Sequence, residues 1–231
     1  ALRCGAHYPI SQSAAAAVMR AGAPSPLHNN CSGKHAGFLC LACSMGVDPA
    51  EYFRPGHPVQ RRVRAVLEDF TGAVLSEESC AIDGCSVPTW AVPLENLARG
   101  FAKFGSGQGL APERAHAVAR LRHACAHEPW YVAGTGRFCT EIMQLFGSRV
   151  FVKTGAEGVY CGALPQQGLG FAVKCDDGAA RAAQAIVAAL VARFLPLDAI
   201  ERTALAPFIR PILHNWNGFE VGAIGVSEML A

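Results

Sequence analysis

The chain has 231 residues, of which 51% are hydrophobic and 16% are charged, with 24 glycines and 14 prolines. A chain of this length and composition can bury a real core, which excludes a disordered protein. The formal net charge is +2, so we expect no nucleic acid and no anionic membrane surface as partner. The longest apolar stretch, residues 185–192, is bounded by polar and charged residues and is too short to span a bilayer.

Ten cysteines raise the question of whether this is a disulfide-stabilised protein. Small secreted proteins need disulfides because they lack a core, and this chain has ample apolar sequence to bury. Cys161 and Cys175 stand in apolar runs, where a free cysteine packs like a small hydrophobe. We expect the same core packing for Cys40 and Cys43, which form a lone C-x-x-C pair in an apolar segment. The cysteines therefore indicate a reduced, cytoplasmic protein.

In chain order, the first predicted element is a polar loop over residues 26–35, followed by an apolar helix over 36–45. A second helix begins after His57 and ends at Gly72, because its apolar residues recur at i, i+3, i+4 and i+7. Two shorter helices are predicted at residues 94–104 and 112–126.

The second half of the chain predicts strands at residues 149–153, 159–164 and 170–175, separated by tight turns. A long alanine-rich helix follows and ends at Leu195, before Pro196. Consecutive antiparallel strands followed by a helix predict an α/β protein of the layered α+β kind. We therefore expect an antiparallel sheet packed with helices rather than alternating βαβ units.

Several common catalytic and metal-binding motifs are absent from the sequence. It contains no G-x-x-x-x-G-K-[ST] loop, no G-x-S-x-G elbow, no H-E-x-x-H and no tandem C-x-x-C. These absences exclude most nucleotide-binding, α/β-hydrolase, zincin and zinc-ribbon functions.

The densest cluster of polar groups is LHNNCSGKHAG at residues 27–37, just before the first predicted apolar helix. Backbone N–H groups and the positive end of the helix dipole could hold an anion there or favour the thiolate of Cys31, as would the nearby Lys34. An ordinary capping loop is the alternative. The number of different chemical groups favours a functional site.

Two further segments carry candidate groups. Asp83-Gly84-Cys85 reads by itself as a β-turn with a buried cysteine. If the fold brings Cys31 and Cys85 together, the two sulfurs could bind a soft or borderline metal such as zinc, or form a disulfide. Lys153-Thr154-Gly155 at the end of a predicted strand matches an element of penicillin-binding proteins and β-lactamases, in which a lysine assists a serine nucleophile.

Taken together, these segments resemble the bacterial asparaginase II family, which is zinc-dependent and has a serine-β-lactamase-like fold. The resemblance runs in order from about residue 2 to residue 225, and the block at residues 28–37 is its most specific part. The matching segments are LHNNCSGKHAGFL, HPVQRRV, IDGCSVPTWAVPLENLA, AGTGRF, KTGAEGVY and HNWNGFEVGAI.

The resemblance implies hydrolysis of the side-chain amide of L-asparagine to aspartate and ammonia, in a cytoplasmic homodimer. It implies zinc ligation by Cys31, Lys34 and Cys85, and the lysine must then bind as a neutral amine. His35 and Asp83 match positions that contact substrate or metal-bound water. Lys153 matches the catalytic lysine that is paired with a serine, through which an aspartyl intermediate forms.

The sequence departs from the family pattern in two places. The family uses a Ser-x-x-Lys segment near its start, and none of the 231 residues forms one. Residues 1–231 are accordingly expected to be the C-terminal two-thirds of an asparaginase II-type domain. Cys139 stands where the family usually has aspartate.

We therefore expect this chain alone to bind zinc but to hydrolyse L-asparagine poorly. One alternative is a non-catalytic metal-binding relative, in which Cys31 and Cys85 persist without hydrolysis. Another is a penicillin-recognising acyl transferase, suggested only by the segment that contains Lys153. Discrimination between asparagine and glutamine depends on the depth of the pocket, on which the sequence is silent.

Overall fold

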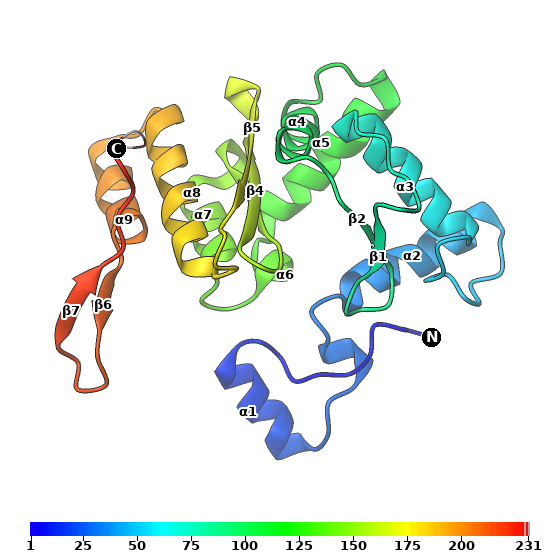
Figure 1. Cartoon of the computed structure of the whole chain (residues 1–231), viewed down its shortest axis with the longest axis horizontal. Coiled ribbons are helices and arrows are strands. Elements are labelled where there is room, and N and C mark those ends of the chain that lie inside the picture. The colour runs from blue at the N-terminus through cyan, green and yellow to red at the C-terminus, as the bar shows by residue number, and fades with distance from the viewer. Residues whose placement is uncertain (229, 231) are drawn as a thin grey trace. The chain divides into compact units, whose positions relative to one another are not determined.

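A computed structural model describes residues 1–228 and 230, and shows a mixed α/β protein with small antiparallel sheets (Figure 1). Its contacts divide the chain into two compact units, Ala1–Val92 and Pro93–Ala231, which are treated separately below. Within the described residues, no helix is both long and apolar enough to cross a membrane. The ten cysteines all lie in the described part of the chain and are free thiols.

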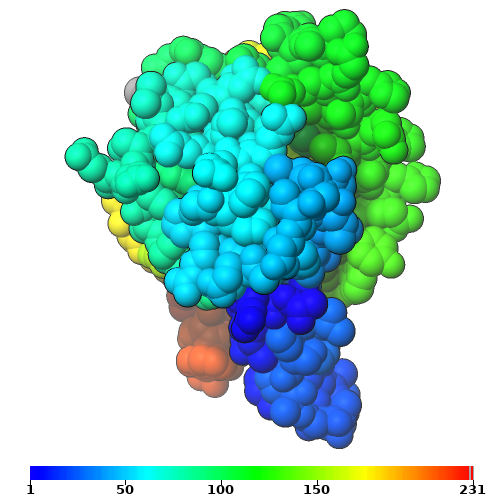
Figure 2. All heavy atoms as spheres, turned by 90° about the vertical axis from the view of Figure 1, so that its right-hand side faces the viewer, coloured from blue at the N-terminus to red at the C-terminus, as the bar shows by residue number. Residues whose placement is uncertain are grey.

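The first unit consists of helices and one small hairpin. Its elements are α1 (Gln12–Ala21), η1 (Pro26–His28), α2 (Ser32–Met45), α3 (Pro58–Thr71), β1 (Cys80–Ile82) and β2 (Pro88–Trp90). Helix α3 begins where its sequence predicts, since the His57 side chain accepts a hydrogen bond from the amide of Val59 and Pro58 stands in the first turn. It ends at Gly72, whose φ of 68° is left-handed. Arg61, Arg62 and Asp69 of α3 are exposed, and the region of this helix faces the viewer in Figure 2 (cyan).

The second unit is built around a three-stranded sheet. Its elements are α4 (Leu94–Ser106), α5 (Pro112–His127), α6 (Trp130–Ala133), α7 (Phe138–Phe146), η2 (Gly147–Arg149), β3 (Phe151–Thr154), β4 (Val159–Leu164), η3 (Pro165–Gln167), β5 (Leu169–Lys174), α8 (Ala180–Phe194), α9 (Ala199–Ile209), β6 (Ile212–His214) and β7 (Glu220–Ala223). The strand order is β3-β4-β5, all antiparallel, so β3 and β5 are the edges.

Helices cover both faces of this sheet. Side chains alternate along β4, so that Tyr160 and Leu164 point into the core formed with α7 and α8. The opposite face packs against α4, and there the contact is closest at two glycines. A Cβ at Gly170 would overlap the backbone of Ala98 and Ala102, and a Cβ at Gly105 would lie 2.5 Å from that of Ala163. The helix approaches the sheet this closely only because both residues lack a side chain.

The predicted antiparallel sheet packed with helices is thus present, and the bounds of β4 coincide with the predicted strand at residues 159–164. The other predicted strands shift slightly, to Phe151–Thr154 and Leu169–Lys174. The helix expected from residue 36 begins at Ser32, because the polar residues that resemble a loop form its first turn. Helices α1, α7 and α9 and the hairpin of β6 and β7 were not predicted.

One prediction about the cysteines is wrong. Cys40 and Cys43 were expected in the core, but both are exposed on α2. The helix is apolar nearly all round, and its buried residues are His35 and Ala42. The sequence therefore could not show which face of α2 is buried, because a helix without a polar side has no face that solvent clearly favours. Cys161 and Cys175 are buried as predicted.

Replacing Gly170 with alanine should destabilise the second unit, because the added methyl group meets the backbone of α4 and not a flexible side chain. Overpacking of this kind costs about 1–3 kcal/mol or more. We expect a lower midpoint of urea denaturation followed by circular dichroism. Gly37→Ala is the control: that helical glycine has open space at its Cβ, so the variant should be unchanged or about 0.5–1 kcal/mol more stable. Equal midpoints for the two variants would contradict the packing described here.

Candidate functional site

The loop that precedes α2 is held in place by a buried asparagine. The Asn29 side-chain amide donates hydrogen bonds to the carbonyl oxygens of Cys4 (2.8 Å) and Gly5 (3.2 Å). Its oxygen accepts a hydrogen bond from the amide of Cys31 at 2.7 Å. Because one side chain satisfies three backbone groups, it fixes the position of Cys31 against the N-terminal segment.

Cys31 is the N-cap residue of α2, and its side chain makes no capping hydrogen bond. The sulfur is therefore not used by the helix and is available to a ligand. It also lies at the N-terminal, positive end of the helix dipole.

The second cysteine of the site is presented by the hairpin of β1 and β2. Its turn is closed by hydrogen bonds from the Ser86 amide to the Asp83 carbonyl (2.8 Å) and from the Asp83 amide to the Val87 carbonyl (2.9 Å). Ser86 has a φ of 80°, in the left-handed region that usually takes glycine. A non-glycine residue there costs about 1–2 kcal/mol. This strained turn places Cys85 and the side chain of Asp83 on the same side.

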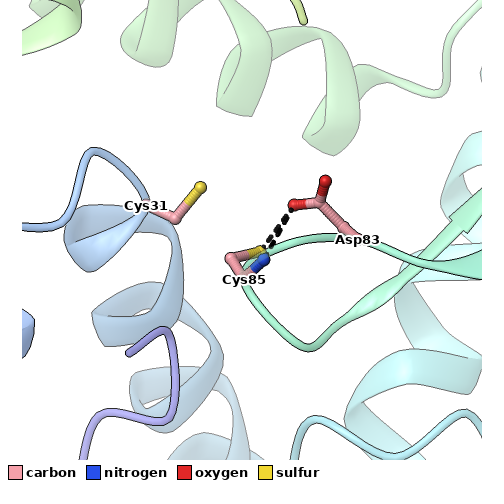
Figure 3. Close-up of side chains that lie close together, drawn as sticks. All are labelled: Cys31, Asp83 and Cys85. Atoms are coloured by element: carbon pink, nitrogen blue, oxygen red, sulfur yellow. Dashed lines mark hydrogen bonds between the residues drawn. The ribbon is translucent and has the colours of Figure 1, made fainter. Parts of the chain in front are cut away.

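The two segments bring three metal-binding side chains together (Figure 3). The sulfurs of Cys31 and Cys85 and a carboxylate oxygen of Asp83 all lie within 4.8 Å of one another. Tetrahedral zinc with two sulfur ligands at about 2.3 Å requires the sulfurs to be roughly 3.7 Å apart. Small side-chain rotations meet that requirement, so this group could hold a metal ion.

Lys34 lies beside the same group. Its Nζ donates a hydrogen bond to the sulfur of Cys85 at 3.2 Å and is 3.8 Å from a carboxylate oxygen of Asp83. Burial alone would lower the pKa of Lys34, but the hydrogen bond to Cys85 and the charges of Cys31, Cys85 and Asp83 outweigh it and raise the pKa. Without a metal the group is therefore an ammonium ion. A bound cation would have to displace this proton for Lys34 to act as a ligand.

The thiol of Cys85 also contacts Asp83, with 2.7 Å between the sulfur and a carboxylate oxygen. Burial, together with the adjacent carboxylate, raises the pKa of Cys85 to about 11, against the opposing effect of Lys34. The same hydrogen bond and the charge of Lys34 lower the pKa of Asp83, although burial acts the other way. In the absence of metal, a neutral thiol thus donates its proton to an ionised carboxylate.

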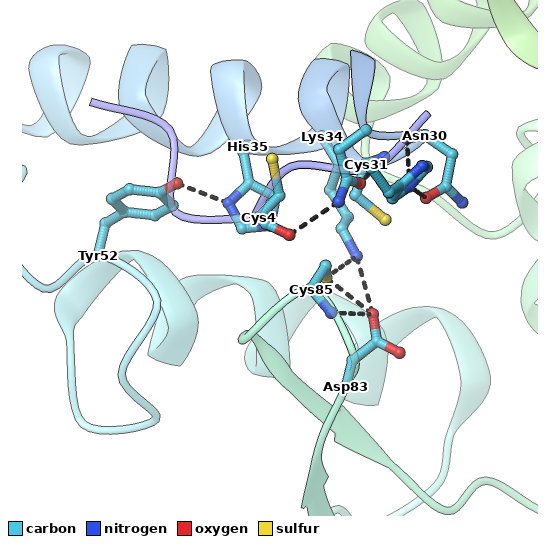
Figure 4. A network of polar contacts seen from close by, with 10 residues as sticks. Cys4, Asn30, Cys31, Lys34, His35, Tyr52, Asp83 and Cys85 are labelled. Carbon is cyan, nitrogen blue, oxygen red and sulfur yellow. Dashed lines mark hydrogen bonds and ion pairs between the residues drawn. The ribbon is translucent and has the colours of Figure 1, made fainter. Parts of the chain in front are cut away.

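His35 follows Lys34 on α2 and is fully buried. Its Nδ1 is 2.6 Å from the hydroxyl of Tyr52 (Figure 4). This hydroxyl also accepts a hydrogen bond from the amide of Arg3 at 2.9 Å. Because the hydroxyl accepts from Arg3, its own proton is free to be donated to Nδ1. A neutral His35 ring would then carry its hydrogen on Nε2.

This tautomer leaves a hydrogen-bond donor for a ligand. Within the described residues, Nε2 of His35 makes no hydrogen bond of normal geometry. Burial and the positive charge of Lys34 lower the pKa of His35, against the weaker effects of Asp83 and the Cys85 backbone. The ring is therefore neutral near pH 7. Within the described residues its buried Nε2–H has no hydrogen bond of normal geometry, and the ring has only a weak interaction with the Cys85 backbone, which leaves this donor able to bind a ligand.

Lys153 belongs to the second unit, on the edge strand β3 as predicted. Its Nζ donates a hydrogen bond to the carbonyl of Thr154 at 2.6 Å. The amide of Thr154 in turn donates to the sulfur of Cys139 at 3.3 Å, and this sulfur is 2.8 Å from the hydroxyl of Tyr160. Cys139 therefore anchors the strand end that carries Lys153, from a buried position in the core.

Of the residues predicted from the sequence, the first unit brings Lys34, Asp83 and Cys85 into direct contact, with the sulfur of Cys31 within 4.8 Å of the Asp83 and Cys85 ligand atoms. His35 lies next to them. Two supporting residues were missed. Asn29 could have been found from the sequence. An asparagine side chain often accepts a hydrogen bond from the backbone amide two residues later, which here is the amide of Cys31. Tyr52 lies 17 residues from His35 and no local pattern marks it.

Comparison with known proteins gives one family. A family described as L-asparaginase II matches residues 1–226 of the chain. No curated protein matches the chain.

If Cys31, Asp83 and Cys85 hold a metal, Cys31→Ser and Cys85→Ser should each abolish its binding, since serine keeps the size of the side chain but not the thiolate. At a free metal concentration about a thousand times the Kd, binding stabilises the wild type by about 4 kcal/mol. We expect this stabilisation in thermal unfolding to vanish in both variants, together with the metal found after dialysis. Cys40→Ser removes an exposed thiol from the same helix and should behave as wild type. Metal retained by the Cys85→Ser variant would rule out this site.

Tyr52→Phe should weaken ligand binding without removing the metal. The variant loses the hydrogen bonds to Arg3 and His35, with a stability cost of about 1–3 kcal/mol. Without the Tyr52 hydroxyl, the proton of the neutral His35 ring is no longer fixed on Nε2. We therefore expect L-asparagine to raise the unfolding temperature less than in the wild type, at unchanged metal content. Tyr131→Phe, at an exposed tyrosine, is the control. An unchanged asparagine shift in the Tyr52→Phe variant would show that His35 does not depend on Tyr52.

Proposed function

Because the chain belongs to the L-asparaginase II family, we propose that it hydrolyses the side-chain amide of L-asparagine to L-aspartate and ammonia. The observation that carries the proposal is the cluster of Cys31, Lys34, Asp83 and Cys85. These residues come from two segments about 50 positions apart and coincide with the most specific family motifs. The family match over residues 1–226 supports the same activity. The serine-β-lactamase-like fold is part of this proposal and rests on the resemblance alone.

Zinc is the metal that fits the donor set best. Two thiolates with a nitrogen or carboxylate ligand are typical of zinc, whereas Mg²⁺ and Ca²⁺ prefer oxygen ligands alone. We assign Cys31 and Cys85 as ligands, with Lys34 as the third. When bound, zinc would supply a positive charge that stabilises negative charge and polarises a bound carbonyl group or water.

The surrounding residues are suited to bind an amino acid. Asp83 is ionised, so its carboxylate can accept hydrogen bonds from the α-ammonium group of a substrate. His35 offers the Nε2–H as a donor to a carboxylate or carbonyl oxygen. Opposite hydrogen-bonding roles on two rigidly held side chains would orient a zwitterion such as L-asparagine.

Asp83 can also serve as a metal ligand, since its carboxylate is within reach of both sulfurs. Asp83→Asn separates the two roles. The amide nearly preserves the shape of the side chain but removes its charge, so loss of substrate binding with metal retained assigns Asp83 to the substrate. Loss of both assigns it to the metal.

Lys153 is proposed to take the proton of a serine nucleophile, which would attack the amide carbon and expel ammonia. The resulting aspartyl ester would then be hydrolysed by water. None of the serines in the 231 residues stands three positions before a lysine, so the chain lacks the Ser-x-x-Lys pattern that the family uses. We therefore propose that this chain by itself binds zinc and substrate but turns over slowly.

Ammonia release from the purified chain, measured with L-asparagine and saturating zinc, tests this proposal. We expect a rate close to that of the Lys153→Ala variant, because the lysine lacks its serine partner, together with a thermal shift by L-asparagine. Robust turnover that Lys153→Ala abolishes would confirm the asparaginase activity and contradict the slow turnover. Repeating the assays with L-glutamine, whose side chain is one methylene group longer, measures the selectivity between the two amides.

The same experiment separates the alternatives. Zinc binding without any stabilisation by L-asparagine would favour a non-catalytic metal-binding relative. A covalent adduct with a β-lactam, detected by intact-protein mass spectrometry, would instead favour a penicillin-recognising acyl transferase, which the Lys153-Thr154-Gly155 segment on the edge strand suggests.

A further inference from the structure

Helix α5 carries a pair of histidines that the proposed function does not use. His123 and His127 stand four residues apart, so they are neighbours on one face of the helix. Both are exposed. Their ring centroids are 6.0 Å apart and their planes differ by only 10°. Within the described residues, neither ring takes part in a hydrogen bond or an ion pair, so both side chains are available to a ligand.

This geometry suits a shared metal ion. A divalent transition metal bound to one nitrogen of each ring, at about 2.0–2.1 Å, needs those nitrogens roughly 4 Å apart or less. Exposed side chains with ring centroids 6.0 Å apart reach that separation by rotation about their side-chain bonds. Two histidines at i and i+4 are also the spacing by which a helix contributes a pair of zinc ligands in metalloproteases.

We propose that His123 and His127 form a second metal site, which binds a divalent transition-metal ion that prefers imidazole, such as Ni²⁺, Cu²⁺ or Zn²⁺. Imidazole ligands select these ions over Mg²⁺ and Ca²⁺. With two protein ligands, water completes the coordination sphere. The site is therefore open and exchangeable, in contrast to the cluster around Cys31 and Cys85. It is independent of the proposed asparaginase activity.

The charges around the pair include favourable and unfavourable ones. The pair lies in the last turns of α5, which ends at His127, so the negative end of the helix dipole favours a cation there. Glu128 follows directly as the C-cap residue and is exposed. Arg120, three residues before His123, opposes cation binding, but its exposed side chain extends into solvent, where its charge is screened.

The test is a calorimetric titration of the full chain with Ni²⁺, after the cysteine cluster has been loaded with zinc. We expect one Ni²⁺ per chain. His123→Ala and His127→Ala should each weaken binding about tenfold or more, since even the loss of a residue that only supports a ligand costs 10–100-fold in metal affinity. Alanine favours the helix, so circular dichroism should confirm that both variants remain folded.

His116 provides a matched control. It is exposed on the same helix but has no histidine four residues away, so His116→Ala should bind Ni²⁺ like the wild type. In the double variant H123A/H127A, adding Arg120→His creates a new i, i+4 pair with His116 and should restore binding. The proposal is overturned if H123A/H127A binds Ni²⁺ as tightly as the wild type, or if His116→Ala loses as much affinity as His123→Ala.

Discussion

The hydrogen bond from Lys34 to the sulfur of Cys85 joins two segments 51 residues apart, and the polar cluster of the first unit is built around it. An ammonium ion, a carboxylate and a neutral thiol share this site, and their hydrogen bonds offset the cost of partial burial. The same atoms are metal ligands once their protons are gone. The hydrogen bonds among these groups therefore place protons where a cation would bind, and they connect helix α2 to the β1–β2 hairpin.

The geometry of this cluster is maintained by groups that touch no metal-binding atom. Asn29 fixes the backbone of Cys31, and Tyr52 fixes the ring of His35. The strained Ser86 closes the turn that presents Cys85. Backbone strain and buried hydrogen bonds of this kind are retained where a site needs fixed geometry. These supporting contacts fix the geometry that the proposed metal site requires.

The second unit is governed by a different constraint, the close approach of α4 to the sheet at Gly105 and Gly170. With α4 on one face and the core of α7 and α8 on the other, β4 is buried in the middle and β3 remains an edge. Lys153 stands on that edge, where its side chain is exposed. His123 and His127 are exposed on α5, so the metal site proposed there uses neither Lys153 nor the cluster around Cys85.

The sequence by itself determined the strand at residues 159–164 and its two neighbours, and the amphipathic helix after His57, because these depend on local periodicity, capping and turn chemistry. It also marked residues 27–37 as the segment with the most polar groups. Local sequence patterns left open whether Cys31 and Cys85 meet, because proximity across more than 50 residues leaves no local signal, and only the family resemblance implied it. The tertiary structure places their sulfurs within 4.8 Å of each other. It also decided that Cys40 and Cys43 face outward, because an apolar helix can bury any side. The tautomer of His35 likewise follows from Tyr52 and Arg3, which only folding brings to the ring.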